Sequence, residues 1–132
     1  MVQQATVLTQ KYPRAFFLWN LLGVANNGLN KISDAASAFK RVTELNPLYP
    51  DGFNNFGATL KAQRKFPEAK TALERAIELK PNYAEAYNNL GLIYKEQSLS
   101  EEALAMFHKC LKIKPNYTDA YTNMGNTLAE QG

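Results

Sequence analysis

The chain has 132 residues, a net charge of +3 at pH 7 and a hydrophobic share of 45%. This length suits one domain, and the interleaving of basic with acidic residues argues against a nucleic-acid surface, which would need a concentrated basic stripe. No apolar run approaches the roughly 18 residues of a membrane span, and the first ten residues lack the layout of a secretory signal. A single cysteine, Cys110, is compatible with a reducing compartment. We therefore expect a cytoplasmic protein without membrane insertion or a nucleic-acid partner.

Glycine and proline recur along the chain with a period of 34 residues. Counted from residue 16, the eighth position of the repeat holds Gly23, Gly57, Gly91 and Gly125, and the thirty-second holds Pro47, Pro81 and Pro115. A period of this length, with small residues at fixed places, is typical of an α-solenoid in which each unit buries its apolar face against its neighbours. The pattern predicts an all-α fold of about eight helices in antiparallel pairs.

In chain order, the pattern predicts a second helix of a truncated repeat over 2–12, full repeats over 16–49, 50–83 and 84–117, and the first helix of a further truncated repeat over 118–132. Apolar side chains in the last segment, Tyr121, Met124 and Leu128, would normally be covered by further chain. We therefore expect a fragment of a longer array, with self-association through the terminal helices as one consequence.

Each repeat carries the same core columns. The fourth position is aromatic, the twentieth is alanine and the twenty-fourth is large and apolar, and we expect the glycine at position eight to let the alanine side of the second helix approach closely. Proline ends the second helices, Pro67 suits the start of one, and Ser100 suits an N-cap. The aromatic, alanine and position-24 columns are Trp19, Phe53, Tyr87 and Tyr121; Ala35, Ala69 and Ala103; and Phe39, Leu73 and Phe107.

These columns resemble the tetratricopeptide repeat signature, an aromatic residue followed by Leu-Gly, then Ala-x-x-x-Phe, then Pro. The resemblance covers nearly the whole chain and implies a right-handed solenoid whose first helices line a concave wall. The stretch from Asp119 to Leu128 is also similar to the repeats of O-linked N-acetylglucosamine transferases and of bacterial transferases fused to such repeats.

Asparagine recurs in the middle of the first helices, where it is a mediocre helix former and therefore needs another reason. The fifth position holds Asn20, Asn54 and Asn88, and the sixth holds Asn55, Asn89 and Asn123, whereas Leu21 interrupts the sixth column. The resemblance implies that the sixth-position amides hold the backbone of an extended peptide, with Lys61 and Lys95 as a positive lip. The alternative is that these amides only bond across neighbouring helices.

Catalysis has little support in the sequence. His108 and Cys110, two residues apart on a helix, point in different directions, so we expect no metal site, no cofactor and no enzyme activity. The sequence therefore predicts a scaffold that binds a protein or peptide partner. The alternatives are an assembly or targeting arm that self-associates, and the substrate-recruiting part of a larger transferase.

Overall fold

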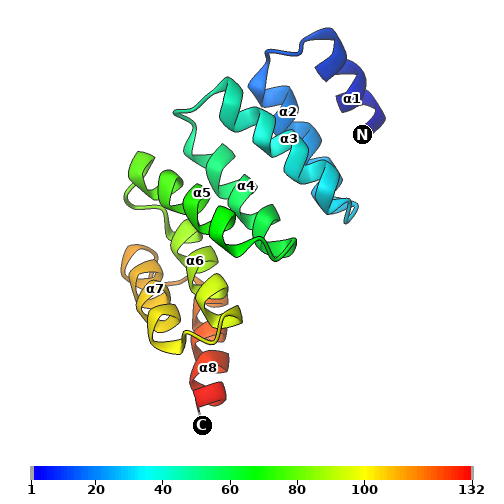
Figure 1. Ribbon diagram of the computed structural model, residues 1–132. Helices are drawn as coiled ribbons and strands as arrows, with labels where there is room; N and C mark the ends of the chain where they lie inside the picture. The colour runs from blue at the N-terminus through cyan, green and yellow to red at the C-terminus, as the bar shows by residue number, and fades with distance from the viewer. Residues whose placement is uncertain (1, 132) are drawn as a thin grey trace.

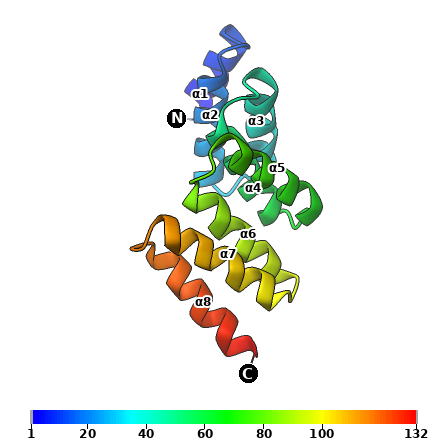
Figure 2. The same ribbon diagram turned by 90° about the vertical axis from the view of Figure 1, so that its left-hand side faces the viewer.

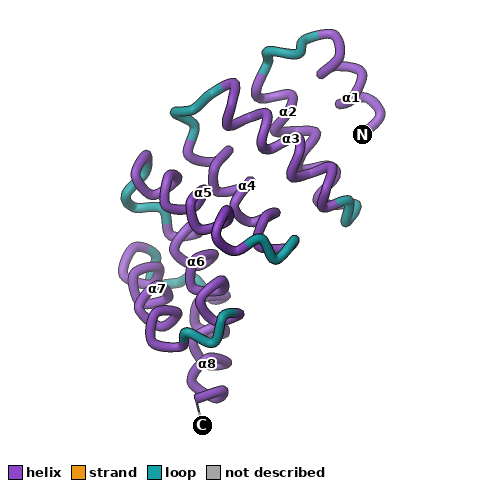
Figure 3. The backbone as a smooth tube through the Cα atoms, in the orientation of Figure 1, coloured by secondary structure: helices purple, strands orange, loops and turns teal. Residues whose placement is uncertain are grey.

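The computed structural model describes residues 2–131, and this part of the chain consists of helices joined by short turns (Figures 1 and 3). The helices are α1 (Val2–Lys11), α2 (Phe16–Gly28), α3 (Ile32–Leu45), α4 (Pro50–Ala62), α5 (Phe66–Leu79), α6 (Ala84–Glu96), α7 (Ser100–Ile113) and α8 (Thr118–Gln131). The predicted all-α architecture of eight helices is confirmed over the described residues.

The helices pack as successive pairs that stack into an elongated solenoid, with the two termini at opposite ends (Figures 1 and 2). Within the repeats α2 packs on α3, α4 on α5 and α6 on α7, and each second helix then contacts the first helix of the next repeat. A tyrosine ends each of the three full repeats, at the boundary with the next repeat, which we call a joint. Tyr49 lies 5.1 Å from Phe16, ring centroid to ring centroid, Tyr83 is buried in the central core cluster, and Tyr117 packs against buried Cys110.

Glycine in the eighth position makes room for one particular side chain. A Cβ atom placed on Gly91 would lie 2.4 Å from the Phe107 ring, and one on Gly23 would lie 2.5 Å from the Phe39 ring. At Gly57 such a Cβ would lie 2.6 Å from the Leu73 side chain and 3.2 Å from the Ala69 carbonyl oxygen. The expectation that this glycine admits the partner helix is therefore confirmed, with the side chain at position 24 as the nearest neighbour. A Cβ placed on Gly125 would have no neighbour within 4 Å among the described residues. Gly125 therefore keeps the repeat pattern but lacks the packing contact that Gly23 and Gly91 make.

The first helices end in a turn that the sequence did not reveal. Asn30, Arg64 and Ser98 have φ angles of 60°, 61° and 62°, which is the left-handed region. The amide of the residue after each of them bonds back to the helix, as Leu99 does to the Tyr94 carbonyl at 2.8 Å. This six-to-one bond is the Schellman termination, in which glycine is the commonest residue at the left-handed position.

The start of α7 differs from the prediction, whereas the ends of the second helices agree with it. Leu99 holds the N-cap position of α7 and makes no side-chain capping bond, so the prediction of Ser100 as the cap is wrong. The preceding Schellman turn sets the direction of the chain there, and Ser100 becomes the first residue of the helix. The second helices stop before Pro47, Pro81 and Pro115 as predicted.

Packing is looser at the N-terminal repeat. In α1 the side chains of Ala5 and Thr9 are buried, whereas Leu8, which aligns with a core column, is 37% exposed. Asn26 replaces the large apolar residue of position eleven and lies buried beside a cavity of about 350 Å³. A shorter polar side chain therefore lines this cavity at the position that Leu60 and Tyr94 hold in the following repeats.

Candidate functional site

The two asparagine columns meet where the first helices of successive repeats lie side by side. The Asn55 amide nitrogen donates to Oδ1 of Asn20 at 3.2 Å, that of Asn89 to Asn54 at 3.1 Å, and that of Asn123 to Asn88 at 3.0 Å. Each bond spans 35 residues, one more than the repeat, because it runs from position six of one repeat to position five of the repeat before. We call these six residues the asparagine ladder.

Two acceptors of the ladder are buried, since Asn54 and Asn88, at position five, are 8% and 6% exposed. Asn20 at the same position is half-buried, as are the position-six residues Asn55, Asn89 and Asn123. A bond to a buried acceptor oxygen removes the cost of leaving it unpaired. Position five therefore stabilises the contact between repeats. Position six exposes the groups of its amide that the ladder does not use.

Lys61 extends the ladder by one bond. Its ammonium lies 3.3 Å from Oδ1 of Asn89, the same amide that donates to Asn54. Burial lowers the pKa of Lys61 below its ordinary value, and the charge of the Glu96 carboxylate opposes that shift. Lys61 thus places a partly desolvated positive charge beside the ladder.

Lys95, one repeat later, has a different partner. Its ammonium pairs with Glu130 at 3.1 Å, and its side chain is 18% exposed. The residue equivalent to Glu130 is Glu96, which pairs instead with Arg64 at 3.3 Å. Ser98 holds the position of Arg64 one repeat later, so Glu130 has no equivalent arginine and pairs with Lys95. The two predicted lip lysines are therefore not equivalent, since one bonds an amide and the other is neutralised.

The ladder has a definite beginning and end within the described residues. Leu21, at position six of the first full repeat, is 36% exposed and interrupts the column as the sequence indicated. Thr122, at position five of the last helix, turns its hydroxyl to the Thr118 carbonyl at 3.3 Å. The amide surface therefore runs from α2 to α8 with Asn20 as its first acceptor.

A second polar contact tightens the central joint. The Tyr83 hydroxyl donates to Oδ1 of Asp51 at 2.5 Å. Burial raises the pKa of Tyr83, and the bond to the Asp51 carboxylate raises it further, because both favour the protonated hydroxyl. The signal for this pair in the sequence is the acidic second position of the repeat, which holds Asp51, Glu85 and Asp119.

The described residues offer little for catalysis. His108 is exposed, while Cys110 is fully buried, and burial raises the pKa of its thiol to about 11. No group of three or more His, Cys, Asp or Glu side chains gathers anywhere in 2–131 in a way that would hold a metal ion. Residues 2–131 contain no helix with the length and hydrophobicity of a transmembrane segment.

Two family models match the chain within its second and third full repeats. A TPR repeat model matches residues 57–98, and a tetratricopeptide repeat model matches residues 84–117. No curated protein sequence matches the chain.

Solved structures share the fold over almost the whole chain. MamA is 24% identical with a TM-score of 0.89, and the match covers 99% of this chain and 77% of that one. The first TPR domain of Spaghetti (RPAP3), bound to an HSP90 peptide, is 19% identical with a TM-score of 0.82, covering 88% and 92%. The TPR2B domain of yeast Sti1, in a complex with pHsp70, is 18% identical with a TM-score of 0.81, covering 87% and 97%. These similarities establish the fold.

Proposed function

Because the chain is a tetratricopeptide repeat protein, we propose that it is a non-catalytic interaction module that holds an extended segment of a partner protein along its first helices. The asparagine ladder is the observation that supports this role. Its bonds hold Asn55, Asn89 and Asn123 in equivalent positions on three successive helices. A surface prepared in this way loses little side-chain entropy when it binds.

Each position-six amide keeps hydrogen-bonding capacity after the ladder is formed. An asparagine has two N–H donors and an acceptor oxygen with two lone pairs, and the bonds between asparagines use one donor. At Asn89 the oxygen also accepts from Lys61 and keeps one lone pair. The oxygen and the second N–H match the N–H and C=O groups of an extended backbone, which have no partners of their own. Adjacent helix axes lie about 10 Å apart, and an extended chain rises about 3.3 Å per residue, so the amides would engage about every third residue.

Peptide binding in structural neighbours supports the same assignment. The Spaghetti domain is bound to an HSP90 peptide, and the Sti1 domain is in a complex with pHsp70. Backbone recognition would tolerate many sequences, and Lys61 would add a preference for a carboxylate near Asn89, the amide to which its ammonium bonds.

Titration with a pool of extended peptides, followed by amide NMR, tests the proposal. We expect shifts on α4, α6 and α8, lost in a variant carrying Asn55→Ala, Asn89→Ala and Asn123→Ala. Three lost contacts of about 0.5–1.5 kcal/mol each would weaken binding by tenfold or more. The matched control replaces three exposed asparagines outside the ladder, Asn27, Asn82 and Asn116, by alanine. Equal binding by both triple variants would refute the role of the ladder.

Self-association is a second candidate, favoured by the apolar surface of α8. Tyr121 and Leu128 are 55% and 52% exposed on this helix. A charge at Leu128 would abolish an assembly formed through α8 and leave peptide binding unchanged. Light scattering of the wild type and of Leu128→Glu tests this candidate. A wild type that stays monomeric at high concentration would exclude it.

A further inference from the structure

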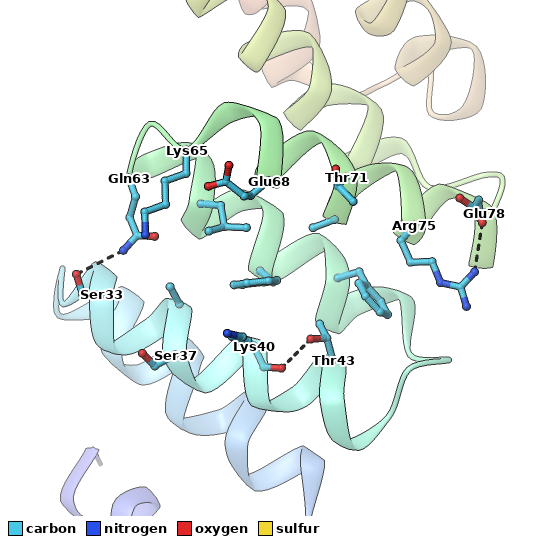
Figure 4. A pocket seen from close by; sticks show the side chains of 15 residues that line it. Ser33, Ser37, Lys40, Thr43, Gln63, Lys65, Glu68, Thr71, Arg75 and Glu78 are labelled. Atoms are coloured by element: carbon cyan, nitrogen blue, oxygen red, sulfur yellow. Dashed lines mark hydrogen bonds and ion pairs between the residues drawn. The ribbon is translucent and has the colours of Figure 1, made fainter.

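A groove of about 990 Å³ lies between the second helices α3 and α5, away from the asparagine ladder (Figure 4). Its floor is apolar and comes from α4, with Phe53, Phe56 and Leu60. Its walls are mostly polar side chains of the two second helices. A concave site with an apolar floor and a few polar groups has the usual make-up of a ligand site.

The groove is open because four columns hold smaller side chains at this joint than they do one repeat later. One repeat later each of these columns holds a larger residue, and the same space is filled. There the Lys70 ammonium lies 4.9 Å from the ring centroid of Tyr94, and Ile77, Tyr94 and Met106 pack against the buried core. The four small residues and their larger equivalents are Ala36 and Lys70, Thr43 and Ile77, Leu60 and Tyr94, and Ala72 and Met106.

The dimensions of the groove suit a short extended segment. It follows α5 from Lys65 to Glu78, and at 1.5 Å per helical residue this stretch is about 20 Å long. An extended chain rises about 3.3 Å per residue, so about six residues would span it.

The polar walls favour an extended occupant over a helical one. A helix satisfies its own backbone groups, whereas an extended segment needs partners along its length. Gln63 donates to the Ser33 hydroxyl at 3.4 Å, and its Oε1 atom is buried without a hydrogen-bond partner among the described residues. Ser33, Ser37 and Thr71 line the groove as well and offer hydroxyl groups to the backbone of an extended segment.

The charges on the rim favour an acidic occupant. Arg75 is paired with Glu78 at 3.3 Å. Lys40 and Lys65, on opposite walls in Figure 4, have no ion-pair partner within 2–131, and Glu68 is the acid that remains. Two uncompensated cations against one acid leave this surface positive.

We propose that this groove is a second protein-binding site, which takes an extended segment of about six residues with apolar side chains at its centre and acidic residues beside them. The apolar side chains would contact Phe53, Phe56 and Leu60, and the carboxylates would pair with Lys40 and Lys65. The site works independently of the asparagine ladder, so the protein would hold two partner segments on different faces.

An acetylated and amidated octapeptide, Gly-Ser-Glu-Leu-Phe-Glu-Ser-Gly, serves as the probe in an amide NMR titration of the whole chain. We expect saturable shifts within 33–43 and 63–78. The same peptide with lysine in place of glutamate should bind at least tenfold more weakly. Lys40→Glu should weaken binding of the acidic peptide about tenfold, whereas Lys112→Glu, on an exposed lysine of α7, should not.

Filling the groove provides the decisive variant. Ala36→Leu with Ala72→Met introduces the residues that the same columns hold at positions 104 and 106, so the fold accommodates them and the charge is unchanged. This variant should lose the peptide shifts and keep its helix content, while the triple asparagine variant keeps the shifts. Unchanged binding by the filled variant, shifts confined to the first helices, or no shifts at millimolar peptide would each overturn the proposal. Failure of the ladder experiment would leave it standing.

Discussion

The side-chain amide of Asn89 donates a hydrogen bond to Oδ1 of Asn54 at 3.1 Å, across the joint between the second and third full repeats. The donor is half-buried and the acceptor is 8% exposed. The bond therefore links the stability of the solenoid to the surface that we propose for the partner.

A double-mutant cycle on this pair should give a coupling energy of about 0.5–1.5 kcal/mol, because the single changes remove one shared hydrogen bond. Urea unfolding of Asn54→Ala, Asn89→Ala and the double variant supplies the three free energies. The control cycle joins Asn54→Ala with Asn123→Ala, which do not bond each other and should be additive within about 0.5 kcal/mol. Equal coupling in both cycles would show that the ladder is not a pairwise contact.

Two glycines of one column should respond to alanine in opposite directions. Gly91→Ala places a Cβ 2.4 Å from the Phe107 ring, so overpacking should lower the free energy of unfolding by about 1–3 kcal/mol. Gly125→Ala meets no atom within 4 Å among the described residues and gains helix propensity, which should raise it by up to about 1 kcal/mol. Thermal unfolding of both variants measures this, and a shift in the same direction would contradict the packing described for Phe107.

Loss of one hydroxyl should weaken the central joint. Tyr83→Phe removes the bond to the Asp51 carboxylate, and bonds to charged groups contribute about 1.5–3 kcal/mol. Tyr121→Phe is the matched change, because its hydroxyl makes an exposed bond to the Pro115 carbonyl at 3.0 Å, and it should cost less than about 0.5 kcal/mol. Chemical denaturation compares the two, and similar losses would mean that Asp51 adds nothing to the joint.

Alkaline pH should destabilise the protein through Cys110. Burial raises the pKa of its thiol from the ordinary 9.0 to about 11 in the folded state. Between these values the unfolded chain releases the proton and the folded chain retains it, so the free energy of unfolding falls as the pH rises from about 9 to about 11 and is unaffected below.

Cys110→Ala isolates this effect, because alanine is the residue that the same column holds at position 76. The pH-induced loss of stability should be smaller in the variant than in the wild type, with the tyrosine contributions common to both. Denaturant titrations at pH 8 and pH 10.5 measure the difference. Parallel curves would show that the thiol titrates normally.

The repeat, the helix pairing and the core can be predicted from the sequence alone. A column such as Ala35, Ala69 and Ala103 needs no tertiary information, because its period states which face is buried, and all three residues are fully buried. The prolines likewise end the second helices through local backbone geometry. Both signals act within one repeat or between equivalent repeats, which is why they can be recognised in the sequence.

The pairing of the polar side chains and the position of the groove depend instead on how the helices are arranged in space. The sequence displayed both asparagine columns, but the bond from Asn55 to Asn20 depends on the offset at which one helix passes the next. In the same way, whether Lys61 meets an amide or a carboxylate depends on the Arg64 ion pair with Glu96 in space. The groove between α3 and α5 arises from small differences in side-chain volume summed over three helices, and no single column records such a sum.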